Sequence, residues 1–409
     1  MTKMSKGINQ DTIQAFNRSL IINLLRKNGI CSRVQLAHTT GLKQATVTNI
    51  VSDFINWGFV KEVGFLNGSK GRRSIGISIN TDAYRVIGVR IARKYYSVGL
   101  FDLTGALHQL QRVDTDPSDQ PKKILENIEK MILDCLEHSS AYTILSIGIA
   151  IPGPFIQKEG RIGLMTETEG WESILIKEEL ERLYHIPVFL EHDANAGVYT
   201  QQWHSKEASE CKELIYVAVG EGIGAGIMIN GEIIRGSLGT AGEIGHTCID
   251  FNGPKCACGN TGCLEKYCSS IAFTNSVNKT LKQNLTFEQV KERVKKEDPV
   301  CLQKFQKACE YLGIGIVNLI NNFNPDMVIL GDEMSHINPG LMYDIVCKVV
   351  KKRIIPEIWN NVKIGFSNIK NDSILYGAAI VAINEVFKNP AKFCTEPMKA
   401  DVTEKPLIM

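Results

Sequence analysis

Beyond residue 83, short apolar runs typical of strands alternate with longer amphipathic runs typical of helices, as far as residue 387. The strand-like runs are 86–92, 95–101, 144–151, 188–190, 214–220, 327–330 and 362–366. The helical runs are 122–137, 195–202, 287–296, 302–321, 341–353 and 373–386. Because helices between strands cover the faces of open sheets, this order predicts an α/β fold in two lobes with a cleft between them.

A histidine and three closely spaced cysteines stand out within this region: His246, Cys256, Cys258 and Cys263. Three thiolates and an imidazole can complete the tetrahedral coordination of zinc, which leaves no open position and predicts a structural metal. The alternative is three free thiols in a glycine-rich loop with little core to bury them. Two neighbouring cysteines are predicted to be packing residues: Cys248 and Cys268.

The first eighty residues are basic. They hold eleven Lys and Arg against three Asp and Glu, a net charge of +8, whereas the rest of the chain carries −6. A basic module on a mildly acidic body favours nucleic-acid binding at one end. A solvated basic surface is the alternative.

Three helical patterns occupy this basic region. Residues 12–27 carry apolar side chains at helical spacing: Ile13, Phe16, Leu20, Leu24 and Leu25. Ser32 is a predicted N-cap for a short helix that Gly41 ends, and a third helix is predicted from 44 to 57. The third helix is expected to bury Val47, Ile50, Val51, Phe54 and Ile55. Two short helices across a glycine turn are typical of a helix-turn-helix, although a protein-interaction module is the alternative.

A predicted β-hairpin follows, with a glycine-rich and basic tip at residues 67–73, and indicates a wing. Short amide and hydroxyl side chains at the start of the third helix can reach base edges, while basic side chains of the wing suit phosphates or a narrow minor groove. The predicted DNA-binding residues are Gln44, Thr46, Thr48, Asn49, Lys70, Arg72 and Arg73.

The segment Gly242-Glu243-Ile244-Gly245-His246, followed by the cysteine cluster and Glu265, resembles the signature of the ROK family of repressors, open reading frames and sugar kinases. Further matches are the segments 151–154, 170–172, 191–196 and 377–379. The N-terminal region, with Gly71-Arg72-Arg73, looks like the winged helix of the repressor branch, which includes xylose repressors.

The resemblance implies an actin-like and hexokinase-like pair of lobes with a sugar between them. It implies sugar-hydroxyl contacts from Asp193, Glu243, His246 and Glu265, and zinc on His246 and the three cysteines. Asp193 matches the base of the family's kinases, although taken alone it also fits a helix N-cap. Two substitutions relative to the kinases alter the sugar face: His192 and Glu167. Glucose therefore cannot be assumed as the ligand, and xylose, a hexose other than glucose, a disaccharide and a sugar phosphate all remain open.

The segments that bind ATP in the family's kinases differ here. Arg90-Ile91-Ala92-Arg93-Lys94 stands in place of Asp-x-Gly-Gly-Thr, and Gly220-Glu221-Gly222 in place of Gly-Thr-Gly. Gly331-Asp332-Glu333 replaces a later glycine cluster. Because a carboxylate repels phosphate, kinase activity is not expected and Asp193 is interpreted as a vestigial catalytic position.

The expected protein is therefore a sugar-responsive DNA-binding repressor, with a sugar kinase or a sugar-dependent scaffold as alternatives. The expected units are a DNA-binding domain (1–80), a smaller lobe (84–192 with 372–388), a larger lobe (193–371) and a tail (389–409). A homodimer or higher oligomer on operator DNA is expected, with the sugar as inducer or corepressor. The start of the chain lacks a secretion signal, and no apolar run is long enough to span a membrane, so a cytoplasmic location is expected.

Overall fold

The computed structural model describes residues 9–66, 73–116, 118–137, 141–153, 155–156, 161–162, 170–171, 174–369 and 372–394, with backbone alone at 155–156 and 161–162. Three predicted site residues lie outside the described residues: Lys70, Arg72 and Glu167. Among the described helices, none combines the length and apolar composition that a membrane crossing requires.

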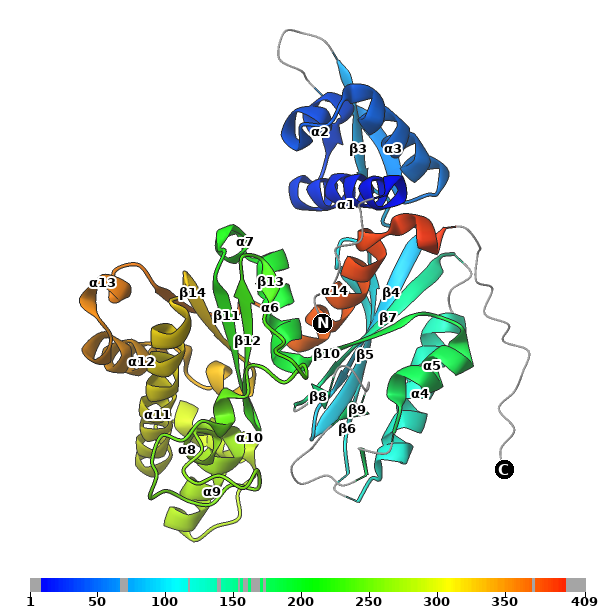
Figure 1. The fold of residues 1–409 in the computed structure, drawn as a ribbon. Coiled ribbons are helices and arrows are strands. Elements are labelled where there is room, and N and C mark those ends of the chain that lie inside the picture. Colours follow the sequence, from blue (N-terminus) through cyan, green and yellow to red (C-terminus); the bar gives the residue numbers. More distant parts are fainter. Residues whose placement is uncertain are drawn as a thin grey trace, which may run out of the picture.

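The N-terminal region forms three helices against a small antiparallel sheet of order β1-β3-β2 (Figure 1). Its elements are α1 (Gln10–Asn28), β1 (Cys31–Ser32), α2 (Arg33–Thr40), α3 (Gln44–Asn56), β2 (Val60–Leu66) and β3 (Ser74–Ile79). Ser32 caps α2 and forms a capping box with Gln35, and Gly41 ends the helix in a left-handed conformation. The three predicted helices and both strands of the predicted hairpin are therefore confirmed.

The buried side of α1 differs from the one its apolar spacing indicates. Three residues of that pattern are exposed, by 36–66% of their surface: Ile13, Phe16 and Leu20. The helix buries Leu25, which belongs to the pattern, together with Ile21 and Ile22, which do not. The reason is that α1 packs against β3 and α2 on one side and against the C-terminal helix α14 (Ser373–Lys388) on another.

The first lobe is built on a five-stranded sheet of order β10-β7-β4-β5-β6. Its elements are β4 (Tyr84–Ile91), β5 (Tyr95–Asp102), β6 (Leu107–Asp114), α4 (Pro121–Glu137), β7 (Thr143–Ile151), β8 (Phe155–Ile156), β9 (Arg161–Ile162), α5 (Ile176–Tyr184) and β10 (Val188–His192). Strands β10, β7 and β4 are parallel, and β5 and β6 continue the sheet antiparallel. One face packs against α4 and α5, and α14 covers the other.

The second lobe carries a five-stranded sheet of order β13-β12-β11-β14-β15. Its strands are β11 (Leu214–Val219), β12 (Ile223–Ile229), β13 (Glu232–Ile233), β14 (Met327–Gly331) and β15 (Lys363–Phe366). Its helices are α6 (Asp193–His204), α7 (Lys206–Glu210), η2 (Ile244–His246), α8 (Glu265–Cys268), α9 (Ser270–Leu281), α10 (Phe287–Lys295), α11 (Pro299–Phe323), η3 (Glu333–His336), α12 (Pro339–Arg353) and α13 (Pro356–Trp359). Helix α6 covers one face, and the large core under α9–α12 covers the other.

Helix α14 joins all three parts of the molecule. It packs on α6 of the second lobe, on β4 and β7 of the first, and on α1 of the N-terminal region. Close approach explains its small residues, because a Cβ at Gly377 would lie 1.9 Å from the carbonyl oxygen of Ala196. The hydrophobic core of the N-terminal region accordingly continues into α14 through Leu375, Ala379 and Ile383.

The predicted tail overlaps a folded turn. Residues 390–393 form a 3-10 turn, η4 (Pro390–Phe393), which contacts α1 and buries Pro390. The expectation of a tail from residue 389 is wrong for this turn, because Phe393 adds apolar surface to the core beneath α1. Residues 395–409 lie outside the described residues.

Candidate functional site

A cavity of about 480 Å³ lies where the two sheets meet. From the first lobe it is reached by Arg90 near the end of β4, by Gly153 after β7 and by His192 at the end of β10. From the second it is reached by Gly220 after β11 and Asp332 after β14. The carboxyl ends of parallel strands in α/β sheets are the usual place for ligands. We call this cavity the cleft.

All of the predicted sugar-binding residues that the structure describes line the cleft: Asp193, Glu243, His246, Glu265 and His192. They form two adjoining groups. Nε2 of His192 lies 3.3 Å from Oδ1 of Asp193 and 3.7 Å from Oε1 of Glu243. Nδ1 of His246 lies 3.6 Å from Oε1 of Glu265.

Glu243 is held by glycines on both sides. Gly242 has a φ of +99°, and a Cβ there would lie 1.9 Å from the carbonyl oxygen of Ala225. A Cβ on Gly153 would lie 2.2 Å from Oε1 of Glu243 and 2.5 Å from Nε2 of His192. Only glycine therefore allows the backbone at 242 to lie against Ala225 and the backbone at 153 to lie against the carboxylate.

Among the predicted sugar-binding residues that the structure describes, two have a buried polar atom without a hydrogen-bond partner: Oε1 of Glu243 and Nδ1 of His192. Burial raises the pKa of Glu243, partly offset by the neighbouring imidazole of His192. A buried polar atom without a partner costs free energy, so both atoms are suited to a ligand that donates and accepts hydrogen bonds. Sugar hydroxyls do both.

Asp193 lies at the start of α6 but is not its N-cap, so the N-cap interpretation is wrong. It is the first residue of α6, and its Oδ1 accepts a hydrogen bond of 2.6 Å from the amide of Ala194. The N-cap position itself belongs to His192. With 21% of its side chain exposed, Asp193 still faces the cleft.

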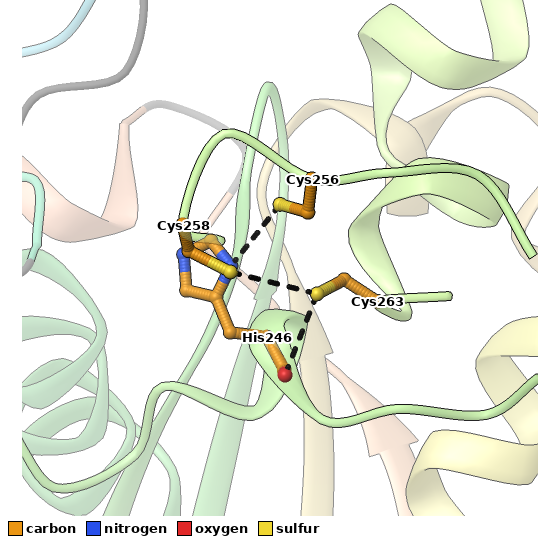
Figure 2. A group of neighbouring side chains, drawn as sticks. All are labelled: His246, Cys256, Cys258 and Cys263. Carbon is orange, nitrogen blue, oxygen red and sulfur yellow. Dashed lines mark hydrogen bonds between the residues drawn. The ribbon is translucent and has the colours of Figure 1, made fainter. Parts of the chain in front are cut away.

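His246, Cys256, Cys258 and Cys263 converge on one point (Figure 2). Their four ligand atoms all lie within 4.8 Å of one another. The sulfurs of Cys258 and Cys263 are 3.7 Å apart, as are the sulfur of Cys256 and Nδ1 of His246. These are the separations that four ligands about 2.0–2.3 Å from one ion would have, so the group can hold a metal ion.

The metal-binding group also touches the cleft. The thiol of Cys256 lies 3.1 Å from Oε1 of Glu265, and His246 belongs to both sets of residues. Of the two neighbouring cysteines, Cys268 is buried as predicted. The prediction for Cys248 is wrong, because its side chain is exposed on the loop that leads away from His246.

A network of ion pairs crosses the cleft beside the sugar-binding residues. Arg90 pairs with Asp332 of the second lobe at 3.0 Å and with Asp372, the N-cap of α14, at 2.6 Å. Lys94 pairs with Glu221 at 3.0 Å and lies 3.7 Å from Glu333. Apart from Asp372, these residues come from the three segments that differ from the kinase pattern.

The network shifts the ionisation of its members. Burial by itself would lower the pKa of Arg90, but the carboxylates of Asp332 and Asp372 raise it well above its usual value. Burial raises the pKa of Glu333 to about 7, against the opposing charge of Lys94. At neutral pH, Arg90 is therefore cationic and Glu333 is close to half protonated.

The predicted DNA-binding residues lie away from the cleft. Gln44, Thr48 and Asn49 are exposed on the first two turns of α3, whereas Thr46 is half-buried on another side of the helix. Arg73 is exposed at the start of β3. Three of the four predicted helix residues are therefore exposed near the start of α3.

Sequence reasoning missed several residues that line the cleft: Tyr95, Arg112, Phe287 and Glu288. Arg112 stacks on Tyr95, with its guanidinium carbon 3.6 Å from the ring centroid. These residues belong to strand β6, to β5 and to the start of α10, so no local motif connects them.

Comparison with known proteins agrees with this architecture. The chain is 30% identical to the xylose repressor of Caldicellulosiruptor bescii over 401 residues, which cover 93% of this chain and 99% of the relative. The solved structure of a ROK family transcriptional regulator, a homolog of the Escherichia coli MLC protein, matches with a TM-score of 0.79 at 23% identity and covers 92% of this chain and 97% of its own.

The ROK hexokinase of Thermus thermophilus matches with a TM-score of 0.62 at 26% identity. It covers 74% of this chain and 99% of its own, so the likeness concerns the two lobes. The lobes therefore have the actin-like and hexokinase-like fold. Residues 86–385 match the model of the ROK family, and the chain belongs to that family.

Proposed function

We propose that this protein, a sugar-responsive transcriptional repressor, binds operator DNA through its N-terminal region and changes its DNA affinity when a sugar enters the cleft. The observation that carries this proposal is the pair of unpartnered buried atoms on Glu243 and His192, in a chain whose first eighty residues carry a net charge of +8. The first feature suits a polyhydroxyl ligand, and the second suits the phosphates of DNA.

The N-terminal region would act as a winged helix-turn-helix. Helices α2 and α3 are joined by a short turn at Gly41, and the hairpin β2–β3 lies beside them. In such modules the second helix enters the major groove with its N-terminal residues against the bases. Gln44, Thr48 and Asn49 occupy that place, and we infer that Arg73, with Lys70 and Arg72, contacts the backbone. Thr46 would contribute less, because it is half-buried.

The sugar would bind through Asp193, Glu243, His246 and Glu265. His192 would alter the pattern of hydrogen-bond donors at the sugar. We retain Glu167 as a further candidate. Relatives at 30% identity are xylose repressors, which makes xylose the first ligand to test. Carboxylates and imidazoles pair with vicinal hydroxyls through both donor and acceptor bonds.

We infer that the His246, Cys256, Cys258 and Cys263 group holds a structural Zn²⁺, because a Cys₃His set prefers zinc and leaves no position for substrate. When bound, the ion would cross-link the loop. Since His246 and Glu265 adjoin it, this loop rigidity would hold both side chains toward the cleft.

Kinase activity is not part of the proposal. By the family resemblance, the Arg90–Asp332 and Lys94–Glu221 pairs belong to the segments that bind ATP in the family's kinases, and their carboxylates would repel phosphate. Glucose, xylose and ATP incubated with the protein should give no sugar phosphate. Turnover that disappears in Asp193→Asn would revive the kinase alternative.

Coupling would run through α14, which reaches from the cleft to α1. We propose the boundaries 1–80, 84–192 with 372–388, and 193–371 for the moving units, and a homodimer that presents two modules to a palindromic operator. A sugar releases DNA only if it binds the non-DNA-competent arrangement more tightly. The opposite preference would make it a corepressor.

The test measures operator affinity with and without xylose for the wild type and for Glu243→Ala. We expect the sugar to change wild-type affinity and to leave that of the variant unchanged, while both proteins bind DNA alike without sugar. Equal affinity in all four cases would contradict a sensing cleft. No binding to DNA from the chain's own promoter region would favour the scaffold alternative. If xylose gives no response, a panel of other sugars is screened by thermal shift, because a sugar that binds the folded protein raises its melting temperature.

A further inference from the structure

A second cavity, of about 660 Å³, lies between α1 of the N-terminal region and the α6–α7 corner of the second lobe. We call it the junction pocket. Its wall is polar, and most of its charged side chains are basic: Arg26, Lys27 and Lys206 line it together with His204, and Glu210 is the only carboxylate among its lining residues. None of these residues belongs to the cleft or to the face of α3.

Arg26 is the unusual member of this wall. Its guanidinium lies over Trp203, with the carbon 4.2 Å from the ring centroid, and its buried Nε has no hydrogen-bond partner among the described residues. Within the described part of the chain it forms no ion pair with a carboxylate. Burial accordingly lowers the pKa of Arg26 to about 10.

The surroundings do not compensate this charge. Desolvation, followed by the charge of Arg26, lowers the pKa of His204, whose ring contacts Tyr376 edge-on at 5.7 Å. Apart from the basic side chains and the carboxylate of Glu210, the remaining wall is uncharged and includes the amides of Gln202 and Asn384. A partly buried arginine is normally paired, because an isolated charge in a poorly solvated place is costly.

We propose that the junction pocket binds a small phosphate-bearing anion, either inorganic phosphate or the phosphate ester of a polyol. The planar guanidinium of Arg26, held flat by Trp203, can donate two parallel hydrogen bonds to phosphate oxygens. Lys206 and Lys27 add positive charge at the rim, and Gln202 and Asn384 suit the hydroxyls of an ester.

The position of the pocket means that a bound anion would affect how two parts of the molecule are connected. A ligand held by α1 on one side and by α6–α7 on the other would fasten the N-terminal region to the second lobe. The resulting effect on operator affinity rests on the proposed function, whereas the binding does not. The two are therefore measured separately, with binding titrated in the absence of DNA.

The experiment is calorimetric titration of the full-length protein with inorganic phosphate and, separately, with glycerol 3-phosphate, using glycerol as the uncharged control. We expect saturable binding of a phosphate probe, weakened about ten-fold or more in Arg26→Gln, since a charge-assisted pair to phosphate accounts for a change of that order. Arg112→Gln removes an arginine from the cleft instead and should leave phosphate binding unchanged. Tighter binding of glycerol 3-phosphate than of inorganic phosphate would indicate that the ligand is a phosphate ester of a polyol.

Lys206→Gln provides a second variant whose exposed side chain can change without loss of fold, and it should weaken binding several-fold. Its melting curve and that of Arg26→Gln are compared with the wild type, so that unfolding is not mistaken for lost affinity. Binding that survives in Arg26→Gln but is lost in Arg112→Gln would place the anion in the cleft and overturn the proposal. Absence of saturable binding of either probe to the wild type would overturn it as well.

Discussion

Arg90 and Asp372 form a 2.6 Å ion pair that ties the end of strand β4 to the N-cap of helix α14. Both side chains are buried, with 7% and 10% of their surface exposed. Asp372 also accepts a hydrogen bond from the amide of Leu375, and its second oxygen accepts one from the hydroxyl of Tyr95. The pair therefore connects the floor of the cleft with the helix that reaches α1.

Asp372→Asn should lower the free energy of unfolding by about 1.5–3 kcal/mol, the cost of removing a charged hydrogen-bond partner, because Asp332 still pairs with Arg90. Urea unfolding measures the loss. Lys307→Ala breaks the exposed pair with Glu310 and is the control, with an expected change below about 0.5 kcal/mol. Equal effects of the two substitutions would mean that burial does not strengthen the Arg90 pair.

Protonation of Glu333 should make stability depend on pH. Its folded pKa of about 7 lies above the value of a free carboxyl, so the folded state keeps a proton that the unfolded state has lost. Stability contributed by the protonated form is present at low pH and falls as the pH rises from about 4.5 to 7. With 27% of the side chain exposed, we expect a loss of about 1–2 kcal/mol over that range.

Glu333→Gln removes this titration, so the stability of the wild type relative to the variant should fall between pH 4.5 and 7. Glu310→Gln, at an exposed position, serves as the matched control. The measurement is urea unfolding at half-unit steps from pH 4.5 to 8. A wild type whose stability rises over this range relative to Glu333→Gln would have the opposite sign and contradict the assignment.

Loss of the metal ion should weaken sugar binding from a distance. Cys258→Ser removes one ligand of the proposed zinc site, and we expect elemental analysis to fall from about one zinc per chain to nearly none. The melting temperature should drop, and sugar affinity should fall about 10–100-fold because Glu265 and His246 lose their support. Cys248→Ser, at an exposed cysteine outside the group, should retain zinc, stability and affinity. A metal-free wild type with the same melting curve would contradict the site.

Substitutions in the wing and in α3 should change DNA binding in different ways. Arg73→Ala should weaken binding to all sequences and reduce the salt dependence of log affinity by about one unit of slope, as expected for one lost phosphate contact. Asn49→Ala should cost about 1–3 kcal/mol on the operator and relax its sequence preference.

Fluorescence anisotropy on specific and random duplexes over a range of salt separates these outcomes. Asn56→Ala, at the exposed far end of α3, is the control and should bind like the wild type. Identical curves for Asn49→Ala and Asn56→Ala would remove the N-terminal end of α3 from the interface.

Local chemistry made several features predictable. The Ser32 cap and the Gly41 stop are determined by residues within one helix length, and both appear where the sequence places them. The metal-binding group is equally local, because Cys256, Cys258 and Cys263 share one tight loop. Family resemblance, rather than spacing, indicated that Asp193 and Glu243 meet in one cavity, and the structure brings them together.

Tertiary packing decided what local patterns could not. Strand β12 escaped prediction because its glycines resemble a loop, yet a Cβ on Gly226 would lie 2.2 Å from the carbonyl oxygen of Ala194 in α6. Helix α1 has apolar residues on more than one side, and the approach of α14 determines that Ile21 and Ile22 are buried while Phe16 is exposed. Arg90 and Asp372 are 282 positions apart, so neither residue's neighbours indicate the other. Caps, turns and metal ligands depend on contacts within a few residues, which the sequence determines directly, whereas buried faces and ion pairs across a cleft depend on which surfaces the folded lobes bring together.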